Sequence, residues 1–312
     1  MQVLKNRLVS TILLISAIML SGCSRQEETA DTAGNISESN SVSSPFRKDN
    51  LVAWCIVPFD AKKRGPEERA RMLETLGITR LAYDWRNEHI VEFDDEIDAL
   101  NRHGIDLEAF WTPCNADNPL DTPNLQTILD LLKRRNVRTQ LWVSLNMDGK
   151  EKKTQDEKVA IAASAIGQLA DAAEKIGCSV GLYNHGGWFG EPENQVAIIK
   201  RLDRPNIGIV YNFHHGHEHI DRFAELVALM RPYLMTLNLN GMKMDGSKIL
   251  SLGAGDRELG MLEIIRDSGY DGPIGILGHR TDEDVEVVLN ENLEGLKKLL
   301  ERLGDATALQ SF

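Results

Sequence analysis

Residues 180–230 read VGLYNHGGWFGEPENQVAIIKRLDRPNIGIVYNFHHGHEHIDRFAELVALM, and strand and helix patterns alternate twice within them. A short β-rich run at 180–184 is followed by a polar, glycine-rich loop and by a helical pattern at 193–202. The same order repeats with a strand at 207–212, a histidine-rich loop and a helix at 220–230. Because parallel strands need crossover connections that are usually helices, this repetition predicts a parallel α/β fold.

The alternation extends in both directions along the chain. Short runs rich in β-branched and aromatic residues alternate with segments whose apolar residues recur at helical spacing. Strand and helix alternate about eight times between residues 51 and 312, which predicts a (β/α)8 TIM barrel. An open doubly wound sheet is the alternative, but no G-x-G-x-x-G turn follows the first strand. The expected strands are 51–57, 79–84, 107–111, 139–143, 180–184, 207–212, 234–238 and 274–277, and the expected helices are 66–76, 124–135, 157–176, 193–202, 220–230, 256–268 and 285–303.

Residues 1–22 have the features of a secretory signal peptide, in which Lys5 and Arg7 precede an apolar run that is too short to span a membrane. Cys23 directly follows Leu-Ser-Gly, which resembles the lipobox of bacterial lipoproteins. The resemblance implies cleavage before Cys23 and lipidation of that residue. Ser24 in place of an aspartate favours the outer membrane of a Gram-negative bacterium, so we expect a lipid-anchored, periplasm-facing protein. An ordinary secreted protein or an uncleaved anchor is the alternative.

Residues 23–50 contain many Ser, Thr, Asn, Asp and Glu residues and few large apolar side chains. Such a segment buries too little surface to offset its ordering entropy, so we expect a flexible linker. Residues 51–312 then remain as one large α/β domain. The cysteines beyond Cys23 form an odd set of three, which predicts buried thiols with at most one pair.

The chain carries a formal net charge of -12. An acidic surface repels phosphate backbones, so nucleic acid is excluded as a partner and a small neutral ligand is favoured. There is no Walker loop, G-x-S-x-G elbow or C-x-x-C pair, which argues against nucleotide hydrolysis, serine-hydrolase chemistry and thiol redox chemistry.

Polar residues gather where the expected strands end, which is the end of a (β/α)8 barrel that carries its chemistry. Six of the eight histidines lie in three of these segments. Side chains of one parity in a barrel strand point inward, so alternate polar residues are expected to meet at the mouth of the barrel. The inner and outer members of each pair are Tyr183 and His185, Asn212 and His214, Asn238 and Asn240, and Leu277 and His279.

Three neutral imidazoles around an open position could hold one divalent transition metal, with His185, His214 and His279 as the ligands. Alternatively, the same histidines bind sugar hydroxyls and donate to loop carbonyls without a metal. The spacing does not indicate the supporting hydrogen bonds that metal-bound histidines need, so the cofactor stays undecided at this point.

Several side chains near strand ends could transfer protons or stabilise charge. His185 and His214 are candidate acid–base groups because an imidazole titrates near neutral pH. Lys243 could stabilise an enolate formed next to a sugar carbonyl, or it could be a solvated surface residue.

Three carboxylates could act as bases or orient these imidazoles: Asp84, Glu108 and Glu191. Each also has a structural interpretation. Asp84 could pair with Arg86, Glu108 could lie beneath the mouth or on the outer face, and Glu191 could occupy a helix start favoured by the helix dipole. Glycoside hydrolysis is a further option, with Asp84 and Glu191 as the pair of carboxylates.

Four of the five tryptophans fall at expected strand ends or in the loops beyond them. Aromatic faces stack on the apolar faces of sugar rings, so these residues predict a carbohydrate site, although core packing is the alternative for each. The expected substrate-binding residues are Trp54, Arg86, Trp111, Trp188, Asn212, Asn238, Asn240 and His279.

The segments GLYNHGGWFGEPENQVAIIKRL at 181–202 and IGIVYNFHHGHEHIDRF at 207–223 resemble the xylose isomerase-like barrels. This family includes sugar-phosphate isomerases and epimerases and the endonuclease-four branch. Many members show Glu-Asn-His-Gly-Gly where this chain has YNHGG at 183–187. The family commonly holds one metal through a carboxylate, an aspartate, a histidine and a glutamate at strands five to eight. The matching residues here are Tyr183, Asn212, Asn238 and Leu277.

None of these four residues is an anion, so the resemblance implies the fold but does not carry over the metal-assisted chemistry. We expect an extracytoplasmic enzyme, isomerase- or epimerase-like, that transfers protons next to the carbonyl of a small neutral carbohydrate or keto-sugar. A keto-glycoside lyase or hydratase and a non-catalytic carbohydrate-binding lipoprotein are the alternatives. Contact with a membrane is expected through the lipid anchor only.

Overall fold

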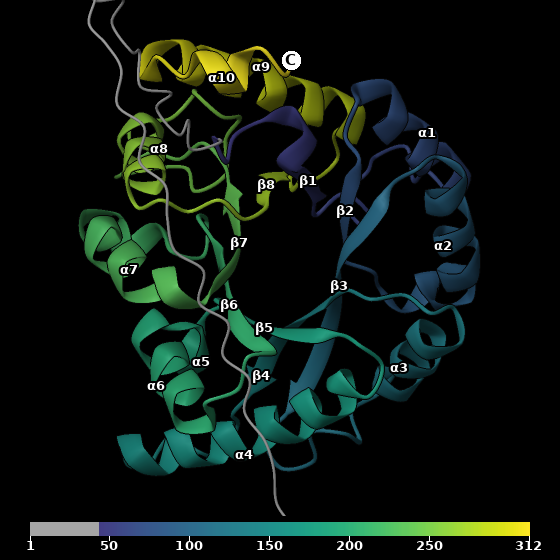
Figure 1. Cartoon of the computed structure of the whole chain (residues 1–312), viewed down its shortest axis with the longest axis vertical. Coiled ribbons are helices and arrows are strands. Elements are labelled where there is room, and N and C mark those ends of the chain that lie inside the picture. Colours follow the sequence, from purple (N-terminus) through teal and green to yellow (C-terminus); the bar gives the residue numbers. More distant parts are fainter. Residues whose placement is uncertain (1–43) are drawn as a thin grey trace, which may run out of the picture. The chain divides into compact units, whose positions relative to one another are not determined.

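The computed structural model describes residues 44–312, in which eight parallel strands form a closed barrel in sequence order and helices surround it (Figure 1). The last strand pairs with the first, so the sheet has no open edge. The predicted (β/α)8 TIM barrel is therefore confirmed, and the open doubly wound sheet is excluded. The strands are β1 (Leu51–Trp54), β2 (Arg80–Tyr83), β3 (Asp106–Asn115), β4 (Gln140–Asn146), β5 (Ser179–Tyr183), β6 (Ile207–Asn212), β7 (Leu234–Leu239) and β8 (Ile274–Leu277).

Helices cover the outside of the barrel, and three of them were missing from the sequence prediction: α2 and the two short helices α5 and α10. The longest of the three, α2, lies between β2 and β3. Its residues Phe93, Ile97 and Leu100 are buried, and its first turn is acidic, as is favourable at a helix start. The helices are α1 (Pro66–Leu76), α2 (Phe93–Arg102), α3 (Leu125–Arg134), α4 (Gln155–Glu174), α5 (Gly187–Gly190), α6 (Pro192–Leu202), α7 (Phe223–Met230), α8 (Glu258–Asp267), α9 (Val285–Leu303) and α10 (Ala306–Leu309), with short 3-10 helices η1 (Lys48–Asn50), η2 (Asn87–Glu92), η3 (His217–Arg222) and η4 (Arg231–Tyr233).

The first strand ends three residues earlier than the sequence predicted. Cys55 has φ of +54°, a left-handed conformation that no strand can continue. The chain therefore leaves the sheet after Trp54, and residues 55–57 turn over the carboxyl-terminal end of the barrel. In contrast, β3 and β4 extend beyond their predicted ends.

Residues 44–50 pack on the barrel, although they were expected to belong to the flexible linker. Phe46 is completely buried, and the side chain of Asn50 donates to the carbonyl of Gly272 over 2.8 Å. The backbone N–H of Lys48 donates to Ser311 Oγ over 2.8 Å. Burying one phenylalanine contributes about 2 kcal/mol, which explains why this end of the segment is ordered.

The expected signal peptide, Cys23 and the remainder of the expected linker lie outside the described residues. Between residues 44 and 312, no helix combines the length and the apolar character needed to cross a membrane. The three cysteines of this part, Cys55, Cys114 and Cys178, are free and buried.

Aromatic side chains fill the inside of the barrel. The ring centroids of Trp54 and Trp142 lie 3.9 Å apart, and that of Tyr183 lies 5.6 Å from Trp54. Gly275 on β8 makes room for this packing, because a Cβ there would lie 2.5 Å from the Trp54 indole and 2.7 Å from Asn238 Oδ1. These rings form the floor beneath the carboxyl-terminal end of the barrel.

Candidate functional site

A cavity of about 270 Å³ lies at the carboxyl-terminal ends of the strands. We call it the mouth cavity. Trp54, Trp142 and Tyr183 form its floor, and its walls come from residues at the ends of β1, β2, β3, β5, β6 and β8. This is the end of the barrel at which the sequence analysis expected the chemistry.

Four imidazoles gather in the mouth cavity: His185 after β5, His214 and His215 after β6, and His279 after β8. Ring centroids are 3.7 Å apart for His214 and His215, 4.5 Å for His185 and His215, and 5.6 Å for His214 and His279. Partial burial lowers the pKa of all four. Neighbouring imidazoles lower it further for His214 and His215, to about 3 and about 2. All four rings are therefore neutral at physiological pH.

A chain of hydrogen bonds inside the barrel orients His214. Its Nδ1 and its backbone N–H each lie 3.2 Å from Asn212 Oδ1. That oxygen also accepts from Asn238 Nδ2 over 2.9 Å, while Asn212 Nδ2 donates to the Tyr183 hydroxyl over 2.9 Å. Because an amide oxygen only accepts, this assignment places the ring proton of His214 on Nδ1. The lone pair on Nε2 is then available as a base.

Asp84 follows β2 and is almost completely buried. Its Oδ1 accepts from the backbone N–H of Val57 over 3.3 Å, whereas its Oδ2 has no hydrogen-bond partner among the described residues. Burial raises the pKa of this carboxyl to about 7, even though the charge of Arg86 acts to lower it. Asp84 can therefore either give or take a proton near neutral pH.

Cys55 lies beside Asp84 in the cavity wall. Burial, together with the negative charge of Asp84, raises the pKa of the thiol well above its ordinary value. The thiol stays protonated, so it is not a nucleophile. Its left-handed backbone conformation is the kind of strain that is often found at functional sites.

Arg86 supplies the positive charge of the mouth cavity. Its Nη1 donates to the carbonyls of Asp84 and Trp85 over 2.7 Å and 2.9 Å. The guanidinium carbon lies 5.7 Å from the ring centroid of Phe59 and 5.8 Å from that of Trp111. The sequence suggested a pair between the Asp84 carboxylate and Arg86, but Arg86 bonds to Asp84 only at the backbone carbonyl. The carboxylate therefore keeps its free oxygen.

Three of the four residues that were expected to converge do line the mouth cavity: His185, His214 and His279. Asn240, which directly follows β7, does not. Its buried side chain donates from Nδ2 to the carbonyls of Gly241 and Lys248 over 2.9 Å and 2.7 Å. Strand parity therefore applied to the histidine positions but not to this amide.

Of the expected sugar-binding aromatic residues, Trp54 and Trp111 line the mouth cavity and Trp188 does not. The indole N–H of Trp188 donates to Gln155 Oε1 over 2.8 Å, in a separate groove. Asn212 and Asn238 lie beneath the cavity in the hydrogen-bond chain that orients His214.

Glu191 and Lys243 do not line the mouth cavity. Glu191 Oε2 lies 3.2 Å from His219 Nε2, at the start of α6, and Lys243 is exposed on the loop after β7. Glu108 lies at the opposite end of the barrel, in the position beneath the mouth. The structure therefore does not bring Asp84 and Glu191 together in one cavity, as hydrolysis by that pair would require.

Some lining residues were not expected from the sequence, in particular Cys55, Phe59, Tyr83 and His215. Parity along β6 places His215 on the opposite face from His214. Because β6 ends at Asn212, parity no longer applies at these positions, and both rings face the cavity. The two consecutive histidines at 214–215 were the sequence feature that could have indicated His215 as a lining residue.

The side chains at the family's metal-binding positions do not fit a metal. Tyr183, Asn212 and Asn238 form hydrogen bonds with one another, and Leu277 is apolar. Asn238 Oδ1 is buried without a partner, but one neutral oxygen is a weak ligand. Throughout residues 44–312, no group of three or more His, Cys, Asp or Glu side chains is arranged to hold a metal ion.

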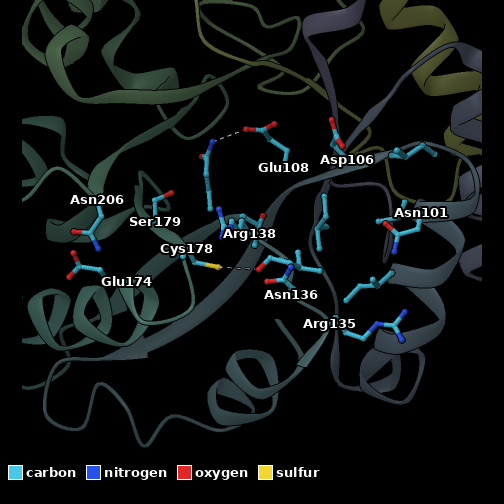
Figure 2. Close-up of a pocket in the computed structure, with 18 residues that line it drawn as sticks. Asn101, Asp106, Glu108, Arg135, Asn136, Arg138, Glu174, Cys178, Ser179 and Asn206 are labelled. Atoms are coloured by element: carbon cyan, nitrogen blue, oxygen red, sulfur yellow. Dashed lines mark hydrogen bonds between the residues drawn. The ribbon is translucent and has the colours of Figure 1, made fainter. Parts of the chain in front are cut away.

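A larger cavity of about 790 Å³ lies at the amino-terminal end of the barrel, along the starts of β3, β4 and β5 (Figure 2). There Glu108 accepts from Gln140 Nε2 over 2.8 Å and from Arg80 Nη1 over 3.2 Å. The thiol of Cys178 donates to the carbonyl of Val137 over 3.7 Å, as Figure 2 also shows. Both oxygens of Glu108 and the Cys178 thiol thus have partners, in contrast to Asp84 Oδ2 in the mouth cavity.

The family model described as "Xylose isomerase-like TIM barrel" matches residues 76–303. No curated protein matches the sequence. Several solved structures are similar. One is 3-keto-D-glucoside 4-epimerase, YcjR, from E. coli, with a TM-score of 0.61 and 14% identity over 80% of this chain and 100% of that chain.

A D-psicose 3-epimerase in the presence of D-fructose has a TM-score of 0.59 and 13% identity, covering 83% of this chain and 99% of that chain. The probable 3-DHS dehydratase AsbF from Bacillus anthracis has a TM-score of 0.59 and 13% identity over 77% of this chain and 97% of that chain. At these identities, the likeness shows the fold.

Proposed function

This chain belongs to the xylose isomerase-like TIM barrel family, and on that premise we propose that it is an epimerase-like enzyme acting next to the carbonyl of a neutral keto-sugar. The similar structures include a 3-keto-D-glucoside 4-epimerase and a D-psicose 3-epimerase, which agrees with a sugar substrate. The observation that carries the proposal is the pairing of Asp84 with neutral imidazoles in one cavity. Asp84 has a free oxygen and a pKa of about 7.

Epimerisation needs one group on each face of the substrate, because the proton leaves from one face and returns on the other. β2 and β6 lie four strands apart in the closed ring of eight, so Asp84 and His214 approach the cavity from opposite sides. His214 Nε2 takes the proton from the substrate carbon, leaving an enolate and an imidazolium. Protonated Asp84 then donates a proton to the other face, and solvent restores both groups.

Arg86 is placed to stabilise the enolate. Its guanidinium lies near the rings of Phe59 and Trp111 and lines the same cavity as Asp84 and His214. A positive charge in a partly dry cavity favours the enolate oxygen over the neutral carbonyl. The enolate in turn raises the pKa of His214 as the proton arrives, which compensates for its low value in the free enzyme.

Proton exchange in heavy water tests this proposal. We expect the wild-type protein to introduce deuterium next to the carbonyl of a 3-keto-D-glucoside, D-psicose, D-fructose or D-tagatose. His214→Ala should slow this exchange at least about 100-fold, the usual contribution of a general base. Lys243→Ala is the control, because Lys243 is exposed and outside the mouth cavity. Absence of exchange with every sugar of this panel would overturn the proposal.

Elimination is the second candidate, since it begins with the same proton removal, and a dehydratase is among the similar structures. NMR of the product separates the two reactions. A product with an inverted hydroxyl supports epimerisation, whereas an unsaturated keto-sugar with loss of water or of an alcohol supports the lyase. Binding of the sugars without any exchange would support a non-catalytic binding protein.

We also propose that the protein is a periplasm-facing lipoprotein anchored through Cys23. The support is the signal-like segment at residues 1–22 and the Leu-Ser-Gly that precedes the cysteine. Metabolic labelling with radioactive palmitate should mark the wild-type protein, and Cys23→Ala should lose the label and leave the membrane fraction. An unlabelled wild-type protein in the soluble fraction would contradict the proposal.

A further inference from the structure

We propose that the substrate contains more than one sugar ring and that its second ring binds in a groove beside the mouth cavity. This inference rests on the proposed function and names the size of its substrate. The groove measures about 510 Å³ and lies between the loop after β2 and the segment that joins β3 to α3. We call it the outer groove.

The outer groove adjoins the mouth cavity. Arg86 and Trp111 line both of them. A ligand that occupies the mouth cavity beside these two residues can therefore extend past them into the groove. The indole N–H of Trp85 donates to the Trp111 carbonyl over 2.8 Å and so joins the loop after β2 to β3 at this point.

The volume of the mouth cavity limits what it can hold alone. Ligand pockets usually measure about 300–1,000 Å³, and the mouth cavity, at about 270 Å³, falls just below that range. It suits one sugar ring. The mouth cavity and the outer groove together reach well into the usual range, which suits two linked rings.

The surface of the outer groove has the chemistry of a carbohydrate subsite. Trp111, Pro113 and Pro123 offer apolar faces on which a sugar ring can stack. Asn124 Nδ2 donates to Asn87 Oδ1 over 3.2 Å. The second polar atom of each amide, Nδ2 of Asn87 and Oδ1 of Asn124, remains to donate to and accept from sugar hydroxyls.

The charges of the outer groove favour a neutral ring. Its charged side chains are one cation and one acid, Arg86 and Glu88. A second groove, of about 480 Å³, shares His185 with the mouth cavity and carries more charged side chains, since Lys150, Lys158, Asp148 and Glu151 line it. We therefore assign the second sugar ring to the outer groove and use the charged groove as the control.

A matched pair of variants tests which of the two grooves binds the second sugar ring. Thr122→Trp fills the outer groove, and Asn146→Trp places the same side chain in the charged groove. Asn87→Ala removes one amide from the outer groove without adding bulk. Melting temperatures within a few degrees of wild type establish that each variant folds.

The probes are methyl 3-keto-glucoside, with one ring, and the 3-keto derivative of a glucose disaccharide, with two. In wild type we expect kcat/KM for deuterium exchange to be at least tenfold higher for the two-ring probe. Thr122→Trp should remove this preference, mainly through KM, and Asn87→Ala should reduce it about threefold to tenfold, as for one lost hydrogen bond. Asn146→Trp should keep the preference.

Equal kcat/KM values for the two probes in wild type would overturn the assignment of the second ring to the outer groove. An unchanged preference in Thr122→Trp would do the same. Either result would leave the proposed function intact. If neither probe exchanges, and no other sugar of the panel does, the proposed function fails instead. Calorimetry with an unoxidised glucose disaccharide then tests whether the outer groove binds a sugar ring. Binding that is lost in Thr122→Trp and kept in Asn146→Trp supports the subsite, and no binding to wild type overturns it.

Discussion

The two ends of the barrel hold cavities of opposite character. The amino-terminal cavity, at about 790 Å³, is far larger than the mouth cavity, at about 270 Å³. At the amino-terminal end, both oxygens of Glu108 accept hydrogen bonds, from Arg80 and Gln140. At the mouth, Asp84 keeps a buried oxygen without a partner, and four imidazoles are held neutral. Unpaired titratable groups, rather than volume, therefore mark the reactive end.

The two ends are nevertheless connected through the barrel interior. Gln140, whose Nε2 donates to Glu108, accepts on Oε1 from Trp142 Nε1 over 2.8 Å and from Thr236 Oγ1 over 3.1 Å. Trp142 in turn packs against Trp54 in the floor of the mouth cavity. The amino-terminal end thus supports the mouth structurally.

Neutralising one carboxylate at each end gives the largest expected difference. Asp84→Asn should lower kcat/KM for deuterium exchange by about 10²–10⁴-fold, because a general acid is lost. Glu108→Gln should change kcat/KM less than about threefold, since its partners are other protein groups. Comparable losses in the two variants would show that the distinction between the ends is incorrect.

The next effect is on stability and its pH dependence. Burial raises the pKa of Asp84 from its ordinary value of 3.8 to about 7, so folding favours the protonated form. The folded state is therefore penalised progressively as pH rises from about 4 to 7, by an amount on the order of a few kcal/mol. Asp84→Asn removes that penalty. The stability of the variant relative to wild type should increase between pH 4 and pH 8.

Urea denaturation at these two pH values measures the difference. Burial also raises the pKa of Glu96 to about 7, but Glu96 is present in both proteins and its contribution cancels. A pH-independent difference between wild type and Asp84→Asn would mean that Asp84 titrates as an ordinary exposed carboxylate.

Much of the fold was predictable because its pattern is local. Eight β-rich runs separated by amphipathic segments are visible without any tertiary information. The errors occur where one residue overrides the pattern. Cys55 ends β1 by adopting a positive φ, and Phe46 brings the end of the expected linker onto the barrel.

Strand parity predicted only part of the site. Closure of the barrel brings His185, His214 and His279 together, as the sequence analysis expected. These histidines, like His215 and Asn240, follow the last residues of their strands, and there loop geometry also decides the direction of a side chain. The directions of His215 and Asn240 therefore did not follow from strand parity. The free oxygen of Asp84 could not be inferred at all, because it depends on what surrounds the carboxylate in three dimensions.

The smallest expected effect tests the connection between the two ends. Trp142→Phe keeps an aromatic ring in the floor but removes the N–H that donates to Gln140. We expect a loss of about 1 kcal/mol in the free energy of unfolding, as for one buried hydrogen bond, and a decrease of less than about tenfold in kcat. If the floor positions the substrate, KM should change less than kcat. A loss of stability with unaltered kcat would instead mean that the amino-terminal network stabilises the barrel without tuning the mouth cavity.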